Sequence, residues 1–186
     1  MSPETVQLFY GLLAVLAVVV IVVLVGLRLA AAVSEGAAGV WDGVAESIAP
    51  NALGLAWLVA FLATAGSLYF SEVAGYVPCT LCWYQRIAMY PLVVILAIGA
   101  ARRDTSAAIY GLAVAGVGAA IALYHTALEW IPSLDTGACS ASTPCTYVWF
   151  RVFGIISLPM LALTAFALII VLLTIRIRHR DQRSDP

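Results

Sequence analysis

The sequence predicts an all-α integral membrane protein, and two observations lead to this fold class. Of the 186 residues, 63% are hydrophobic and only 10% are charged, and the mean hydropathy is +1.03. A soluble domain of this size has too little interior to bury so much apolar surface, so the expected solvent is lipid. In addition, five apolar segments are each long enough to span a ~30 Å hydrocarbon core as a helix. The net charge of −1, without a clustered basic patch, argues against nucleic-acid binding.

Residues 1–33 form the first predicted unit, an N-terminal transmembrane helix. Residues 8–27 carry no charge, and about 20 apolar residues suffice to cross a bilayer. A cleaved signal peptide is the alternative, but Glu4 stands where a positive n-region is expected, and the apolar run is long. In residues 34–51, acidic residues are interspersed with apolar ones in an amphipathic pattern of roughly helical period. This pattern favours an amphipathic helix lying along the membrane interface, with a polar linker as the alternative.

The other four spans are expected within residues 52–176. They cover residues 52–70, 79 to about 98, 106–128 and 149–175, with a loop over residues 129–147 and a basic tail over residues 177–186. With five spans, Arg28, the pair Arg102 and Arg103, and the arginine-rich tail all fall on one side of the membrane. The positive-inside rule makes that side cytoplasmic, so the start of the third span and the loop face the extracytoplasmic side.

A thiol pair, Cys79 and Cys82, opens the third span directly after Pro78. Proline suits a chain that enters a helix, so both thiols are expected in the first helical turn. Unpaired backbone N–H groups and the helix dipole favour the thiolate form there. Arg86 lies one turn deeper on the same face, where a cation requires a polar recipient such as a thiolate or the oxygen of an electron acceptor. Half of a zinc site and a snorkelling arginine are the alternatives.

A second cysteine pair, Cys139 and Cys145, lies in the predicted external loop. All four thiols then share the oxidising side of the membrane, where disulfides are expected. Two neighbouring pairs can exchange disulfides with each other, which favours a redox relay over a purely structural disulfide in the loop.

These motifs, taken together, resemble the DsbB/BdbC group of membrane thiol oxidases over residues 52–175, and most closely the BdbC-type members with a short second cysteine loop. The matching features are Pro78-Cys79-x-x-Cys82-x-x-x-Arg86, Tyr124-His125-Thr126, the Cys139/Cys145 loop and Trp149-Phe150. The resemblance implies a four-helix bundle in the bacterial inner membrane, here preceded by an extra N-terminal transmembrane helix. It also implies an enzyme that reoxidises an extracytoplasmic DsbA-like thiol oxidoreductase and passes the electrons to a membrane quinone, either ubiquinone or menaquinone.

The resemblance also assigns roles to individual residues. It implies that the partner's thiolate attacks Cys139 and that Cys145 exchanges with Cys79. It further implies that the Cys82 thiolate lies against the quinone ring, that Arg86 stabilises this thiolate and the quinone oxygen, and that His125 lies near the quinone. No metal site is expected. Only five residues separate the loop cysteines, which leaves little slack for Cys145 to leave Cys139 and reach Cys79.

Two other functions remain open from the sequence. A vitamin K epoxide reductase-like protein also couples thiols to a quinone, but in that family the loop cysteines precede the membrane CxxC, and here they follow it. A non-enzymatic membrane protein could instead use the four cysteines as structural disulfides or as a zinc site. The wide second spacing and the oxidising face argue against zinc.

Overall fold

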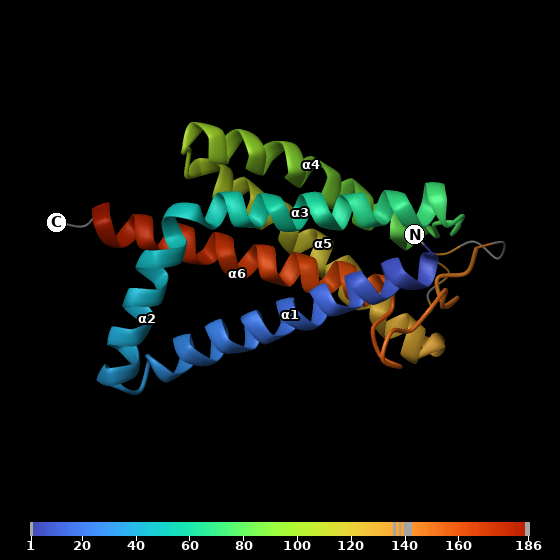
Figure 1. Ribbon diagram of the computed structural model, residues 1–186, viewed down its shortest axis with the longest axis horizontal. Helices are drawn as coiled ribbons and strands as arrows, with labels where there is room; N and C mark the ends of the chain where they lie inside the picture. Colours follow the sequence, from blue (N-terminus) through green and yellow to red (C-terminus); the bar gives the residue numbers. More distant parts are fainter. Residues whose placement is uncertain (1, 136, 138, 140–142, 185–186) are drawn as a thin grey trace.

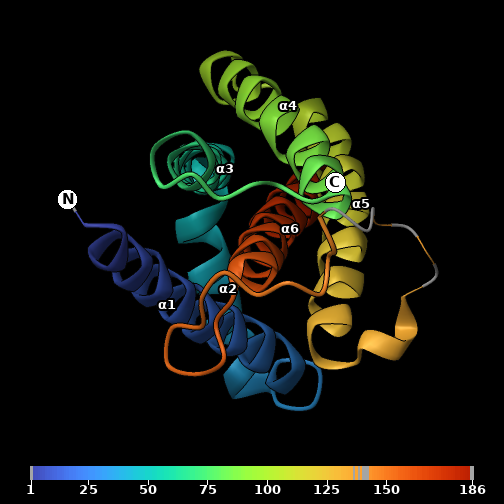
Figure 2. The same cartoon turned by 90° about the vertical axis from the view of Figure 1, so that its right-hand side faces the viewer.

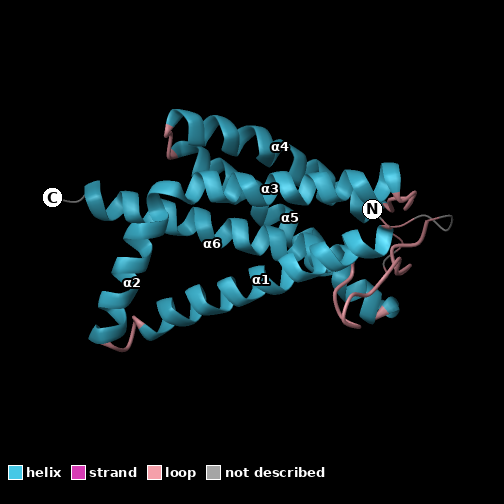
Figure 3. Ribbon diagram, viewed as in Figure 1, coloured by secondary structure: helices cyan, strands magenta, loops and turns pink. Residues whose placement is uncertain are grey.

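The computed structural model of the chain describes residues 2–135, 137, 139 and 143–184. The elements follow the order α1 (Pro3–Ala30), α2 (Glu35–Ile48), η1 (Ala49–Asn51), α3 (Ala52–Leu68), η2 (Tyr69–Val73), α4 (Thr80–Arg102), α5 (Ser106–Trp130), η3 (Pro132–Leu134) and α6 (Leu158–Ser184). The described residues contain helices and loops but no strand, apart from one isolated bridge between Val152 and Ile156 (Figure 3). Five helical segments are long and apolar enough to cross a membrane, so the predicted all-α membrane fold is confirmed.

Helices α3 to α6 form a bundle with a tightly packed apolar core. Its centre consists of fully buried side chains from α4 and α6: Leu92, Leu96, Phe166, Ile169 and Leu173. Gly118 of α5 lies so close to the Phe166 ring that an added Cβ would overlap it. Small residues of this kind let membrane helices approach closely, and Figure 2 shows α6 in the middle of the other long helices.

Helices α1 and α2 precede this bundle and lie against part of it. Helix α1 contacts α6 near the N-terminus and diverges from the bundle toward its own C-terminal end (Figure 1). Helix α2 then runs across the bundle axis to reach α3, and it buries none of its residues. Residues 35–48 are therefore a helix and not a linker. Its position at a membrane interface stays a prediction.

Two boundaries of the last predicted span were wrong. The segment from Trp149 does not continue as a helix, because Phe153 and Gly154 have positive φ angles of 53° and 74° that no α-helix includes. Helix α6 instead begins at Leu158, with Pro159 in its first turn. It also continues through most of the predicted tail to Ser184, since no glycine or proline interrupts residues 176–184.

Candidate active site

Cys79 and Cys82 occupy the N-terminal end of α4, as predicted. Cys79 is the N-cap residue with extended backbone (φ −75°, ψ 175°), and its sulfur accepts a hydrogen bond from the backbone N–H of Cys82 at 3.3 Å. The thiol therefore takes the capping role that a serine or aspartate side chain usually has. Cys79 is only 6% exposed, so the sulfur is shielded from bulk water.

The two thiols of this pair contact each other. Both are free, and their Sγ atoms lie 2.8 Å apart. The hydrogen bond from the Cys82 thiol is the largest influence on Cys79, and a hydrogen bond from His125 adds to it. Together they outweigh burial and lower the pKa of Cys79 from 9.0 to about 4. Cys79 is thus a thiolate at neutral pH, which makes it a good leaving group in disulfide exchange.

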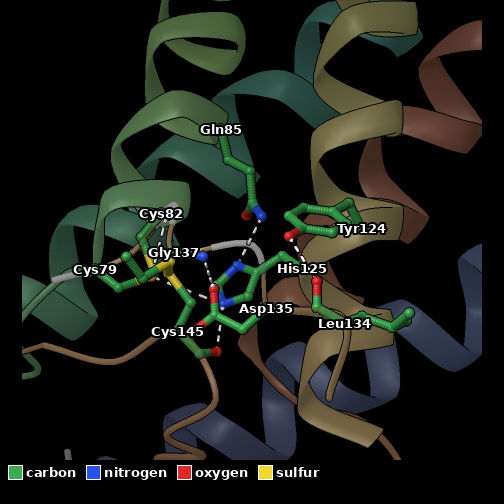
Figure 4. The surroundings of a disulfide bond; sticks show 10 residues. Cys79, Cys82, Gln85, Tyr124, His125, Leu134, Asp135, Gly137 and Cys145 are labelled. Atoms are coloured by element: carbon green, nitrogen blue, oxygen red, sulfur yellow. Dashed lines mark hydrogen bonds between the residues drawn. A yellow bond between two sulfur atoms is a disulfide. The ribbon is translucent and has the colours of Figure 1, made fainter. Parts of the chain in front are cut away.

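His125 connects the thiol pair to the cysteine loop (Figure 4). Its Nε2 atom lies 3.1 Å from the carbonyl oxygen of Cys145 and 3.7 Å from Cys79 Sγ. A carbonyl oxygen only accepts, so Nε2 must carry the proton. On the other side of the ring, the side-chain amide nitrogen of Gln85 donates to Nδ1 at 3.0 Å. The Nε2–H group of His125 therefore points at the loop carbonyl and at Cys79 Sγ.

The loop disulfide lies directly against the thiol pair. Cys139 and Cys145 are bonded to each other, with Cα atoms 5.8 Å apart. Cys145 is 1% exposed and belongs to one apolar cluster with Cys79, Leu81 and Leu128, whereas Cys139 is only half-buried. All four cysteines thus belong to or pack against one cluster, and Figure 4 shows Cys79, Cys82 and Cys145 near one another. Cys145 thus lies in the same cluster as Cys79, and disulfide exchange between them stays a prediction.

Arg86 is buried one turn below the thiols and is held by α3. Its Nε and Nη2 atoms donate to the hydroxyl and the carbonyl oxygen of Ser67, each at 3.0 Å. The guanidinium carbon also lies 5.1 Å from the Trp83 ring centroid, within range of a cation–π contact. The sequence predicts a thiolate or an acceptor oxygen as the recipient of this cation. The structure assigns Ser67 to that role.

A cavity of about 320 Å³ lies beside Cys82 and Arg86. Its walls are mostly apolar and come from α1, α3, α4 and α6, while Cys82, Gln85 and Arg86 supply polar groups from α4. A largely apolar cavity with a few polar groups is typical of a site for a small apolar ligand that has polar atoms. Ser67 and Gln85 were missed from the sequence, although a polar residue inside an apolar span is itself a signal of function.

A second cavity of about 290 Å³ is lined by Cys79, Cys82, His125 and Glu129, together with loop residues. Glu129 was treated as the beginning of the loop, but it lies one turn beyond His125 on α5, is 9% exposed and accepts a hydrogen bond from Ser157. The described residues that line the larger cavity do not include His125. The structure thus places His125 beside the thiols, and its contact with a quinone stays a prediction.

The zinc alternative gains little from this geometry. Cys79, Cys82 and His125 offer ligand atoms within 4.8 Å of one another. However, the Nε2 atom of His125 is protonated toward Cys145, and Cys139 and Cys145 are bonded to each other. A tetrathiolate site would need four free thiolates, so this arrangement is suited to thiol chemistry rather than to structural zinc.

The known proteins to which this chain is similar are disulfide bond formation proteins. The model of the family "Disulfide bond formation protein DsbB" matches residues 49–175. A probable disulfide formation protein of Oceanobacillus iheyensis is 45% identical over 138 residues, which are 73% of this chain and 95% of the relative. A probable disulfide formation protein C of Halalkalibacterium halodurans is 46% identical over 125 residues, or 67% and 91%.

The disulfide bond formation protein C of Bacillus subtilis is 46% identical over 116 residues, which are 62% of this chain and 84% of that protein. No solved structure matches the chain at comparable significance. The relatives are thus matched over nearly their whole length, whereas helices α1 and α2 precede the part of this chain that the family model covers.

Proposed function

The chain belongs to the DsbB family of disulfide bond formation proteins, and from this premise we propose that it reoxidises a DsbA-like thiol oxidoreductase and passes the electrons to a membrane quinone. The observation that carries the proposal is the position of Cys82. This thiol contacts the Cys79 thiolate on one side and lines the large apolar cavity beside Arg86 on the other. Sulfur chemistry and a lipid-soluble acceptor can therefore meet at one atom.

Electrons enter at the loop disulfide. A thiolate of the reduced partner attacks Cys139, the more exposed of the two loop cysteines, and the electron pair of the broken bond leaves on Cys145. The partner's second thiolate then attacks the mixed disulfide, which releases the oxidised partner and the Cys139 thiolate. The loop now holds two electrons as two thiolates.

The electrons next move to the helix end. The Cys145 thiolate attacks Cys79 in a Cys79–Cys82 disulfide and releases the Cys82 thiolate. Cys139 then attacks Cys145, which re-forms the loop disulfide and releases Cys79 as a thiolate. The low pKa of Cys79 and the His125 hydrogen bond favour this release. The result is a bonded loop pair with a reduced helix pair, which is the pairing found in the structure.

The last transfer needs a strong oxidant, since DsbA-like proteins have potentials of about −120 mV. A bound quinone would supply it by taking up two electrons and two protons. The residues present fit such a group, because the cavity is apolar and the guanidinium of Arg86 can donate to a carbonyl oxygen. Cys82 and Cys79 would become a disulfide again in this step.

The orientation forms part of the proposal. The four cysteines and the N-terminus lie at one end of the bundle, and the connection after Arg102 and the C-terminus lie at the other (Figure 1). With the arginine-rich end in the cytoplasm of a bacterial cell, the cysteines meet their partner outside the inner membrane.

Anaerobic mixing of the purified protein with a quinone and a reduced thioredoxin-fold partner tests the proposal. We expect loss of quinone absorbance in step with partner oxidation. Cys82→Ser should stop quinone loss, while Cys139→Ala should stop partner oxidation. Thr126→Ala serves as the matched control, because this hydroxyl bonds only to the Ala122 carbonyl of its own helix among the contacts of the described residues. Full turnover by either cysteine variant contradicts the assigned roles.

A further inference from the structure

We propose that α1 is the closing wall of the acceptor cavity and that its side chains contact the bound quinone. This inference rests on the proposed function and extends it to a helix that lies outside the family match at residues 49–175. It gives the extra N-terminal helix a role in acceptor binding rather than in membrane anchoring alone.

The first observation is the composition of the cavity wall. Helix α1 contributes a row of lining residues with helical spacing, from Tyr10 through Ala14 and Ala17 to Val20. They line the same cavity as the α4 residues Cys82 and Arg86. The α1 wall is apolar except for the Tyr10 hydroxyl, so it suits the ring face and the isoprenoid chain of a quinone, while α4 provides the polar groups for the oxygens.

The second observation is that α1 is attached at the cavity by specific contacts. The Tyr10 hydroxyl donates to the Leu62 carbonyl oxygen at 3.1 Å, and the Gln7 amide donates to the Tyr76 hydroxyl at 2.7 Å. The Tyr10 ring lies so close to Gly66 that a Cβ there would be 2.6 Å from the ring. The two contacts of Tyr10 fix α1 against α3, and the Gln7 bond fixes it against the segment that follows η2.

A further contact joins α1 to the segment that precedes α6. Gly11 faces Val152 so closely that a Cβ at residue 11 would be 2.7 Å from the valine side chain. The N-terminal half of α1 thus packs against both α3 and the segment of residues 149–157. Trp149, the first residue of that segment, also lines the cavity. Six of the residues that line the cavity beside Cys82 and Arg86 therefore come from α1.

The test narrows the cavity from the α1 side. Ala17→Phe adds a ring to the wall, whereas Val18→Phe adds one to the neighbouring position, which is 40% exposed and does not line the cavity. Quenching of the protein's tryptophan fluorescence by a short-chain quinone reports binding without turnover, since Trp149 is one of the residues that line the cavity. We expect Ala17→Phe to raise the Kd about tenfold or more, with Val18→Phe unchanged. Ala17→Leu should give a smaller shift in the same direction.

A single-turnover measurement distinguishes a failure of the proposed role of α1 from a failure of the proposed function. Oxidation of the reduced partner by the loop disulfide should proceed at wild-type rate in Ala17→Phe, since α1 does not line the cavity at the loop. Equal Kd values for Ala17→Phe and Val18→Phe overturn the role of α1 while leaving the proposed function intact. Failure of the wild-type protein to bind or reduce any quinone overturns both.

A photoreactive azidoquinone gives a readout that needs no substitution. Trypsin cleaves after Arg28, so nearly all of α1 is released as one peptide, residues 1–28. We expect label in this peptide and in the peptide that contains Cys82. Label confined to residues after Arg28 contradicts a wall formed by α1.

Discussion

Replacing His125 by alanine is expected to raise the pKa of Cys79 and to weaken the link between the loop and the helix end. The substitution removes the Nε2–H that lies 3.7 Å from Cys79 Sγ and 3.1 Å from the Cys145 carbonyl oxygen. A hydrogen bond to a charged group contributes about 1.5–3 kcal/mol, and one pKa unit corresponds to about 1.4 kcal/mol. The long sulfur distance favours the lower value, so the pKa should rise by about one unit from about 4.

The structure also predicts a ranking of variants. The Cys82 thiol is the largest influence on the Cys79 thiolate, ahead of His125, so Cys82→Ala should raise the pKa of Cys79 more than His125→Ala does. The pKa of Cys79 is lower in the folded protein than in the unfolded chain. The thiolate-dependent part of the stability is therefore fully present above about pH 9 and is lost as the pH falls through about 4.

The assay is an anaerobic pH titration of thiolate ultraviolet absorbance, with the loop disulfide intact and Cys79→Ser as the blank. Thr126→Ala is the matched control on α5, since its hydroxyl bonds to the Ala122 carbonyl at 2.8 Å. A wild-type titration midpoint in His125→Ala, or a smaller shift in Cys82→Ala than in His125→Ala, would refute the reasoning.

Three further predictions concern other parts of the molecule. Arg86→Met should weaken quinone binding about tenfold while the fold is retained. Arg102 is exposed at the far end of α4, so Arg102→Met should leave quinone binding unchanged. Equal quinone affinity of the two variants contradicts the role assigned to Arg86. Gly118→Ala should lower the thermal midpoint through overlap with Phe166, at a cost of about 1–3 kcal/mol, whereas Gly116→Ala, with open space around it, should not; equal midpoints argue against this packing. A reporter fused after Arg183 should register as cytoplasmic, and an external signal overturns the orientation.

The sequence alone determined the features that depend on local pattern. Apolar runs of sufficient length predicted five membrane-crossing helices, and the structure contains five helical segments that are long and apolar enough to cross a membrane. The position of Pro78 and the CxxC predicted a thiol pair at a helix end, since capping depends on neighbouring residues. The family resemblance, based on the type, order and spacing of the same residues, is confirmed by the family match.

The hydropathy pattern predicted the wrong start for the last span, because the backbone conformation of residues 149–157 excludes a helix there. The apolar residues 149–157 carry no charge except Arg151 and look like part of a span, but two residues with positive φ turn the chain before α6 begins. A hydropathy pattern reflects the polarity of side chains and carries no information about backbone φ angles, so it cannot reveal a turn of this kind. The helical tail shows the converse, because charge suggested a separate segment although the local propensity continued the helix.

Only the tertiary structure decided the partners of the site residues. Ser67 and Arg86 are 19 residues apart, and Gln85 and His125 are 40 apart, so no spacing rule along one helix pairs them. The same holds for α1, whose apolar surface would be equally compatible with lipid, and for Glu129, whose charge suggested a loop. Hydrophobicity places a segment in the membrane, but the packing of helices distant in sequence determines which face meets the thiols and which meets the lipid.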